Sequence, residues 1–177
     1  MNETAGLVLA AGAGRRFGTP KAPVVVDGER LVDRAVRVLR EGGCRPVLVV
    51  LGAWIGGVPG AEVIVNDDWQ SGMASSLRIG LTEMAQLTDA QRALVTLVDL
   101  PGLTAAAVER LAASSDDLAV ATYSGDRGHP VLMSREHWAS VAESVSGDQG
   151  ARRYLQSHSV SLVEVGDVAS GADLDEP

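Results

Sequence analysis

Short apolar runs alternate with amphipathic segments along most of the chain. Runs of strand length predict strands at Gly6–Ala11, Val47–Leu51, Glu62–Val65, Ala93–Val98, Leu118–Thr122, Pro130–Met133 and Val160–Val165. Apolar residues that recur every three or four positions predict helices at Leu31–Glu41, Ser75–Ala85, Ala105–Ala113, Arg135–Ser144 and Gln149–Gln156. Because strands and helices alternate, the pattern predicts an α/β fold with a mostly parallel sheet covered by helices on both faces. No repeat or linker interrupts it, so we expect one domain over residues 1–177.

Capping and turn residues sharpen some of these boundaries. Gly42-Gly43 is placed to end the first helix, and Thr104 is placed to cap the third. Asp27-Gly28 predicts a tight turn, and Ser75 and Asp148 are natural N-caps for the second and last helices.

Composition limits the classes of function. The chain has 177 residues, 46% of them apolar but only 3% aromatic, so Val, Leu and Ala must fill the core. A net charge of −8 argues against nonspecific binding to nucleic acid or to an anionic membrane. The single cysteine, Cys44, excludes an internal disulfide. No apolar run is long enough for a membrane span, and Met1-Asn2-Glu3 lacks a basic leader region, so we expect a cytoplasmic protein.

The most informative segment is the loop that follows the first strand, Leu-Ala-Ala-Gly-Ala-Gly-Arg-Arg-Phe-Gly-Thr-Pro-Lys, from Leu9 to Lys21. Gly12 and Gly14 let backbone N–H groups approach phosphate oxygens, while Arg15, Arg16 and Lys21 supply positive charge. The spacing fits neither a P-loop nor a dinucleotide-binding fingerprint. It indicates a long loop that wraps over a nucleoside triphosphate.

An aspartate at the end of the fourth strand suits the same ligand. Asp99 starts an Asp-Leu-Pro-Gly segment at the edge of the sheet where α/β proteins bind ligands. Its carboxylate is suited to hold Mg²⁺ on a triphosphate, or it simply starts a turn. The glycine-rich loop favours the metal, because the two features are parts of one nucleotide site.

Together these segments resemble the molybdenum-cofactor nucleotidyltransferases, which have a three-layer, Rossmann-like GT-A fold. The opening motif matches at Leu9, Ala10, Ala11, Gly12, Gly14, Arg16, Phe17, Gly18 and Lys21. A second motif, typical of the cytidylyltransferase branch, matches at Asn66, Trp69, Gly72, Met73, Ser76, Leu77, Gly80 and Leu81. The resemblance implies that Arg16, Lys21 and Asp99 are catalytic, with Asp99 as the Mg²⁺ ligand. It implies nucleotide binding by Leu9, Ala10, Ala11, Gly12, Gly14, Arg16, Lys21, Asn66 and Ser76.

Two further motifs extend the resemblance to an acceptor site. Gly128-His129-Pro130 and the hexad Gly147-Asp148-Gln149-Gly150-Ala151-Arg152 both occur in the family beside the acceptor. The implied acceptor-binding residues are Gly72, Met73, His129, Asp148 and Arg152. From residue type alone, His129 could be an ordinary partly buried histidine and Asp148 a helix cap. The tail Asp173-Leu174-Asp175-Glu176-Pro177 is similar to the family's Asp-Ile-Asp-Thr-Pro, or is a solvated acidic end.

The expected reaction transfers a nucleoside monophosphate to a phosphorylated acceptor and releases pyrophosphate. Relatives with Ala at the position of Ala11 tend to use CTP, so we expect CTP, with molybdopterin as the acceptor and a molybdoenzyme or its insertion chaperone as partner. Two alternatives remain open: a transferase acting on a sugar phosphate or another small phosphate ester, and a non-catalytic protein that binds molybdenum cofactor.

Overall fold

The computed structural model describes residues 3–177. Its strands are β1 (Thr4–Ala10), β2 (Val25–Val26), β3 (Glu29–Arg30), β4 (Val47–Leu51), β5 (Glu62–Val65), β6 (Arg92–Leu97), β7 (Leu118–Tyr123), β8 (Asp126–Ser134) and β9 (Ser161–Glu164). Its helices are α1 (Leu31–Glu41), the short 3₁₀-helix η1 (Trp69–Ser71), α2 (Met73–Leu87), α3 (Ala105–Ala112), α4 (Arg135–Ser144) and α5 (Arg152–Gln156). None of the helices within this range is long and apolar enough to cross a membrane.

A seven-stranded sheet in the order β5-β4-β1-β6-β8-β7-β9 forms the middle of the molecule. The strands β5, β4, β1 and β6 are parallel, β8 is antiparallel to both neighbours, and β9 is parallel to β7. The carboxyl ends of β1 and β6, the end of β7 and the start of β8 therefore share one edge of the sheet. This mixed, mostly parallel arrangement confirms the predicted fold class, and the shared edge is where such sheets bind ligands.

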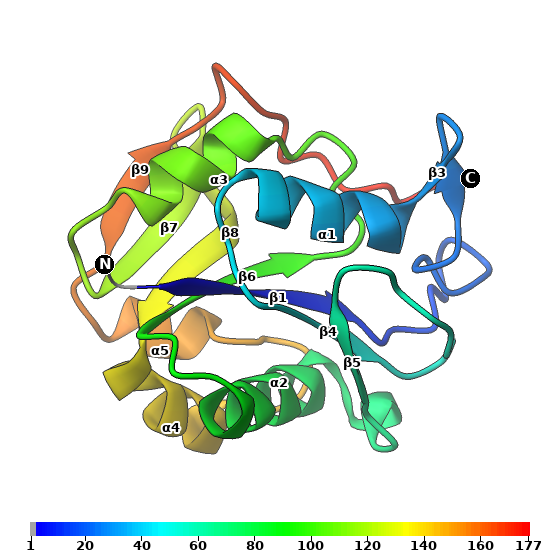
Figure 1. Ribbon diagram of the computed structural model, residues 1–177, viewed down its shortest axis with the longest axis horizontal. Coiled ribbons are helices and arrows are strands. Elements are labelled where there is room, and N and C mark those ends of the chain that lie inside the picture. Colours follow the sequence, from blue (N-terminus) through cyan, green and yellow to red (C-terminus); the bar gives the residue numbers. More distant parts are fainter. Residues whose placement is uncertain (1–2) are drawn as a thin grey trace.

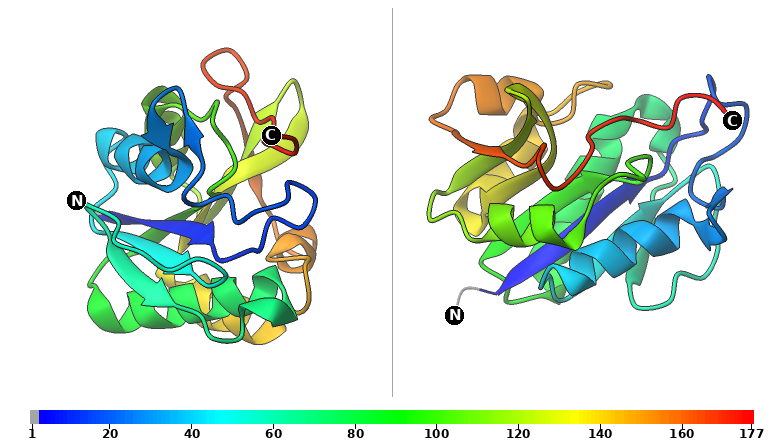
Figure 2. Two further views of the ribbon diagram at one scale, coloured as in Figure 1. Left: turned by 90° about the vertical axis from the view of Figure 1, so that its right-hand side faces the viewer. Right: turned by 90° about the horizontal axis from the view of Figure 1, so that it is seen from above.

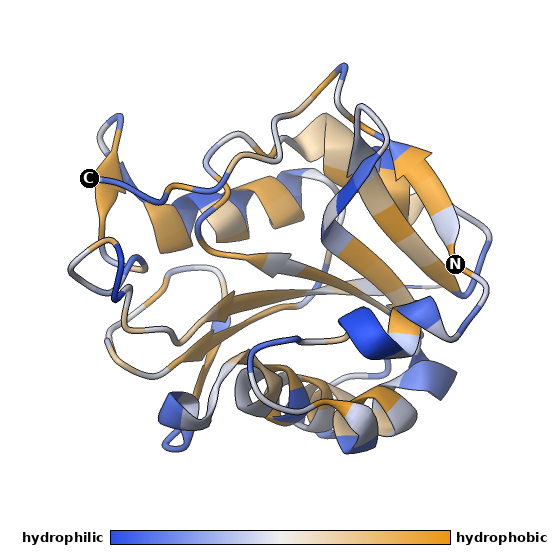
Figure 3. Ribbon diagram, turned by 180° about the vertical axis from the view of Figure 1, so that it is seen from behind, coloured by the Kyte–Doolittle hydropathy of each residue, from blue (hydrophilic) through white to orange (hydrophobic). Residues whose placement is uncertain are grey.

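Helices cover both faces of the sheet, α1 and α3 on one side and α2, α4 and α5 on the other (Figure 1). Alternation along β1 explains why both faces are apolar: Val8 packs with α1 and α3, whereas Leu7 and Leu9 pack with α2. Leucine, methionine and valine supply the largest fully buried side chains, so methionine joins the Val and Leu that the sequence predicted for the core. The strands are accordingly the most hydrophobic part of the ribbon (Figure 3).

Several local predictions are confirmed. Asp27 and Gly28 turn the chain between β2 and β3 with positive φ angles of 52° and 82°. Gly43 follows α1 with a φ of 93°, and the Thr104 hydroxyl accepts the Ala107 amide at 3.3 Å as the N-cap of α3.

Other boundaries differ from the prediction. The second helix begins at Met73 with Gly72 as its N-cap, and Ser75 lies in its first turn, where its hydroxyl donates to the Gly72 carbonyl at 2.8 Å. The last helix is only Arg152–Gln156, so Asp148 does not cap it. β8 starts at Asp126 instead of Pro130, because the turn before it closes a hairpin with β7.

The segment after β9 crosses the molecule from the far edge of the sheet to the β2–β3 hairpin (Figure 2). It has no regular secondary structure but is tied down along its length. The Thr104 hydroxyl donates to the Val168 carbonyl at 2.9 Å, and the amides of Ser170 and Leu174 donate to the carbonyls of Gly102 and Asp99 at 3.0 and 2.9 Å. The acidic tail thereby reaches the carboxyl ends of β1 and β6.

Candidate active site

The glycine-rich loop leaves β1 and folds back on itself. Gly14 has a φ of 61°, and a Cβ there would overlap the Thr19 carbonyl, while the Gly18 amide donates to the Gly14 carbonyl at 2.7 Å. At Gly12, by contrast, a Cβ would meet only open space. Gly14 therefore allows the loop to close, and Gly12 leaves room above the strand end.

Lys21 and Asp99 form the charged centre of this edge. The Lys21 ammonium donates to Asp99 Oδ2 at 2.9 Å and lies 3.6 Å from Asp175 Oδ1. The other Asp99 oxygen, Oδ1, is buried and has no hydrogen-bond partner within residues 3–177. Since an unpaired buried carboxylate oxygen is costly, this atom is well placed to accept a further ligand.

The acidic tail adds negative charge at the same place. Burial, Asp99 and Asp175 together raise the pKa of Asp173, and Lys21 partly opposes them. Two carboxylates thus contact one ammonium and a third, Asp173, lies within the range of their charges. Carboxylate oxygens suit Mg²⁺ or Mn²⁺. The orphaned oxygen of Asp99 and the nearby carboxylates fit the divalent metal that the sequence predicted.

A cavity of about 360 Å³ opens beside this charged centre. The residues on its wall are Leu9, Ala11, Gly12, Ala13, Gly14, Arg15, Lys21, Trp69, Gln70, Gly72, Met73, Ser76, Leu97, Val98, Asp99 and Asp148. It therefore collects most of the predicted nucleotide-binding residues around one space. Arg16 is exposed on the loop, Ala10 is buried in the core, and Arg15 is the arginine on the cavity wall.

Asn66 is buried behind this cavity. Its amide donates to the hydroxyls of Ser75 and Ser76 at 2.8 and 3.0 Å, and its carbonyl accepts the Asp68 amide at 3.0 Å. These contacts fix the turn between β5 and α2, so Asn66 supports the cavity from behind without lining it. Ser76 itself lines the cavity.

A second cavity, of about 630 Å³, lies between β8 and α5. Its floor is apolar and includes Leu77, Val95, Val120, Val131, Met133 and Leu155. Its polar residues are Arg127, His129, Asp148, Gln149, Arg152 and Gln156. All the predicted acceptor residues except Gly72 line it, and Gly72 lines the first cavity.

The two cavities share Leu9, Met73 and Asp148. Asp148 lies over the start of α2, where its Oδ1 accepts the Met73 amide at 3.4 Å, and Gly147 accepts the Ala74 amide at 2.9 Å. A Cβ on Gly72 would collide with both residues. Asp148 therefore caps α2 from a distant loop and not, as the sequence predicted, the last helix. It also lies where the two cavities meet.

His129 is presented to the second cavity by a break in the β7–β8 pairing. Val120 pairs with Val131 and Thr122 with Arg127, so Gly128, His129 and Pro130 bulge opposite Ala121. Burial lowers the pKa of His129, with partial opposition from the Asp99 carboxylate. The imidazole is therefore mainly neutral at pH 7 and able to donate one hydrogen bond.

Several wall residues had no assigned role in the sequence analysis, among them Trp69, Gln70 and Arg127. Trp69 belongs to the second motif, so the sequence could have indicated a binding role for it. Gln70 and Arg127 only lie next to motif residues, and nothing else in the sequence marks them as binding residues. Within residues 3–177, the group whose potential ligand atoms all lie within 4.8 Å of one another is Asp117, Glu136 and His137, and it lies at the opposite edge of the sheet.

Comparison with known proteins identifies the family. Residues 6–162 match the MobA-like NTP transferase domain. The chain is 38% identical to nicotine blue oxidoreductase of Paenarthrobacter nicotinovorans, over 96% of this chain and 91% of that protein. It is also 37% identical to a probable molybdenum cofactor guanylyltransferase of Opitutus terrae, over 58% of this chain and 50% of that one.

The solved structures agree with this match. Rv0371c of Mycobacterium tuberculosis superposes with a TM-score of 0.83 at 28% identity, covering 99% of this chain and 93% of that one. A further structure of Rv0371c is a complex with manganese, with a TM-score of 0.75 at 25% identity over 92% of this chain and 88% of that chain. The chain belongs to the MobA-like NTP transferase family.

Proposed function

We propose that this protein is a cytoplasmic, Mg²⁺-dependent cytidylyltransferase that transfers CMP from CTP to molybdopterin and releases pyrophosphate. The observation that carries the proposal is the pair of cavities joined at Asp148. One has the glycine-rich loop, Lys21 and Asp99 on its wall. The other combines an apolar floor with two arginines and suits an acceptor that has both a ring system and a phosphate.

The chemistry follows from the charges. The acceptor phosphate attacks the α-phosphorus of the nucleotide, a new P–O–P bond forms, and pyrophosphate leaves from the opposite side. Gly12 gives the loop amides access to the phosphates, while Arg15, Arg16 and Lys21 neutralise the leaving pyrophosphate. Asp99, with Asp173 beside it, would hold Mg²⁺, which supplies charge neutralisation on the triphosphate when bound.

The acceptor is oriented from the other side. Arg152 and Arg127 can pair with its anionic groups, and neutral His129 can donate a hydrogen bond to it. Met73 and the apolar floor exclude water from the ring system. The protein's contribution is alignment and charge balance, and no covalent enzyme intermediate is required.

Ala11 supports the choice of CTP. It lies on the wall of the nucleotide cavity, and its methyl group reduces the space for a base, which favours a pyrimidine over a purine. The relative named a guanylyltransferase makes GTP the nucleotide to compare first.

A second candidate function is an oxidoreductase. It is favoured by the relative that shares 38% identity over nearly the whole chain and is named nicotine blue oxidoreductase. In this case the nucleotide cavity would hold a redox nucleotide, and the second cavity would hold the compound that is reduced.

One assay separates the candidates. Pyrophosphate release is measured with Mg²⁺ and CTP, GTP, ATP or UTP, with molybdopterin or a sugar phosphate as acceptor. Release with CTP and molybdopterin supports the proposal, and release with only the sugar phosphate moves the acceptor to that class. No release, together with oxidation of a reduced nicotinamide nucleotide by nicotine blue, favours the oxidoreductase. Molybdopterin binding with neither reaction would indicate a non-catalytic accessory protein.

A further inference from the structure

The hairpin formed by the end of β7 and the start of β8 projects residues into the second cavity. We call residues 122–130 the acceptor arm. Arg127, Gly128 and His129 line the cavity from this arm. Pairing of β8 with β6 ends at Val131, so the arm lies beyond the main ladder. Pro130 has no N–H to donate, and the bulge leaves His129 outside the β7 ladder. The arm keeps the pairs Thr122–Arg127 and Tyr123–Asp126 and pairs with β9 at Thr122–Glu164, so contacts within the arm and from β9 fix its position.

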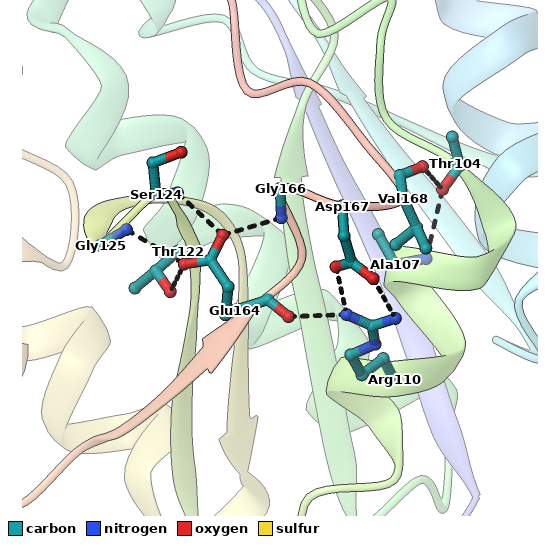
Figure 4. A network of polar contacts seen from close by, with 10 residues as sticks. All are labelled: Thr104, Ala107, Arg110, Thr122, Ser124, Gly125, Glu164, Gly166, Asp167 and Val168. Carbon is teal, nitrogen blue, oxygen red and sulfur yellow. Dashed lines mark hydrogen bonds and ion pairs between the residues drawn. The ribbon is translucent and has the colours of Figure 1, made fainter.

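Glu164, at the end of β9, clamps the turn of the arm (Figure 4). Its carboxylate accepts the Ser124 and Gly125 amides at 2.8 and 3.0 Å, and the Thr122 hydroxyl at 2.9 Å. The Gly166 amide adds a fourth hydrogen bond at 3.0 Å. Ser124 and Gly125 have positive φ angles of 53° and 88°, as in a tight two-residue hairpin turn, and Glu164 binds the amides of both turn residues.

Tyr123 fixes the other end of the arm. Its hydroxyl donates to the His129 carbonyl at 2.6 Å. The ring packs so closely against Gly128 and Gly171 that a Cβ at either position would crowd it. The bulge that carries His129 is therefore held from within the arm and from the C-terminal segment.

We propose that Glu164 and Tyr123 are positioning residues for acceptor binding, which hold Arg127 and His129 in the second cavity without contacting the acceptor. The inference rests on the proposed function. It goes beyond it by assigning acceptor affinity to a carboxylate on β9, a strand from which none of the cavity wall residues comes.

Glu164→Gln and Tyr123→Phe test the proposal. Gln places an NH₂ group against two hydrogen-bond donors, and Phe removes only the hydroxyl. Asp167→Asn is the matched control, because Asp167 lies on the same segment but pairs with Arg110 on α3, with Nη2 to Oδ2 at 3.1 Å (Figure 4). We expect the KM for molybdopterin to rise at least about tenfold in both test variants, with the KM for CTP and kcat unchanged. The control should match wild type.

Hydrogen exchange of the free protein gives a second readout that needs no substrate. Amide exchange at 124–129 should accelerate about tenfold or more in Glu164→Gln, but not in Asp167→Asn, while β1 and β6 stay protected. Unchanged acceptor KM in an active Glu164→Gln enzyme, or unchanged exchange in the arm, overturns the inference. If wild-type protein transfers no nucleotide, the proposed function fails, and the exchange rates alone decide whether Glu164 holds the arm.

Discussion

Lys21 is the only lysine in the sequence, and it lies where the glycine-rich loop meets Asp99. Its side chain is 14% exposed, so its charge is well shielded from solvent. Lys21→Ala should reduce kcat/KM by about 10²–10³-fold, the usual effect of losing one preorganised charge. Circular dichroism should show a folded protein. An active Lys21→Ala enzyme would remove the residue from the mechanism.

The role of Asp99 as a metal ligand can be tested without measuring enzyme activity. If its orphaned Oδ1 receives a metal, Mg²⁺ or Mn²⁺ alone should raise the melting temperature of the wild-type protein. Asp99→Asn keeps the size of the side chain but should abolish this shift. Thermal unfolding with and without metal measures this shift. Glu176→Gln is the control, because Glu176 is an acidic residue of the same tail. An equal shift in Asp99→Asn would place the metal elsewhere.

At the scale of the elements, the loop after β1 contains two glycines with different functions. Gly14→Ala forces a side chain onto the Thr19 carbonyl at a positive φ, and should cost about 1–3 kcal/mol of stability. Gly12→Ala meets no protein atom, so it should leave the melting temperature unchanged while raising the KM for CTP. Urea unfolding and initial rates distinguish the two. Equal destabilisation by both would contradict these assignments.

Most of the strands and most helix ends could be predicted from the sequence, because local signals determine them. Buried strands show as apolar runs, and Thr104 caps the helix that directly follows it. The start of α2 could not be predicted, since its cap comes from Gly147 and Asp148, more than seventy residues away. The first part of β8 was missed because Asp126–Pro130 lacks an apolar alternation and depends on pairing with β7.

The candidate site likewise has residues that local motifs predict and residues that only contacts between distant segments place. Contiguous motifs located the glycine-rich loop, Asp99 and the residues around both cavities. Arg127 and Glu164 belong to no motif, and their place depends on how β8 and β9 pair with β7. The buried position of Asn66 likewise appears only when the turn before α2 is folded over it. The positions of these residues therefore depend on contacts between segments that are far apart in the sequence.

At the scale of the whole molecule, acid stability should report on the Glu164 clamp. Backbone amides lower the pKa of Glu164 from 4.5 to about 2. A lowered folded-state pKa stabilises the protein fully above pH 4.5, and this contribution is lost as pH falls towards 2. The difference in unfolding free energy between wild type and Glu164→Gln should therefore shrink over that range in urea titrations. A constant difference from pH 6 to 2 would contradict the clamp.

The molecule carries a net charge of −8, yet Arg15, Lys21, Arg127 and Arg152 line the two cavities. This distribution concentrates positive charge where the proposed nucleotide and acceptor phosphates would meet, and Asp148 lies where the two cavities join. Under the proposed function, both cavities form one reaction site. This requires a phosphorus atom to pass from the nucleotide in one cavity to the acceptor in the other.

The most direct measurement uses CTP labelled with ³²P at the α-phosphorus, together with Mg²⁺ and molybdopterin. We expect the label to move to the acceptor, the released pyrophosphate to be unlabelled, and Lys21→Ala to slow the transfer by about 10²–10³-fold. Label that stays in CTP, or that appears as free CMP at a rate independent of molybdopterin, would contradict a single transfer site.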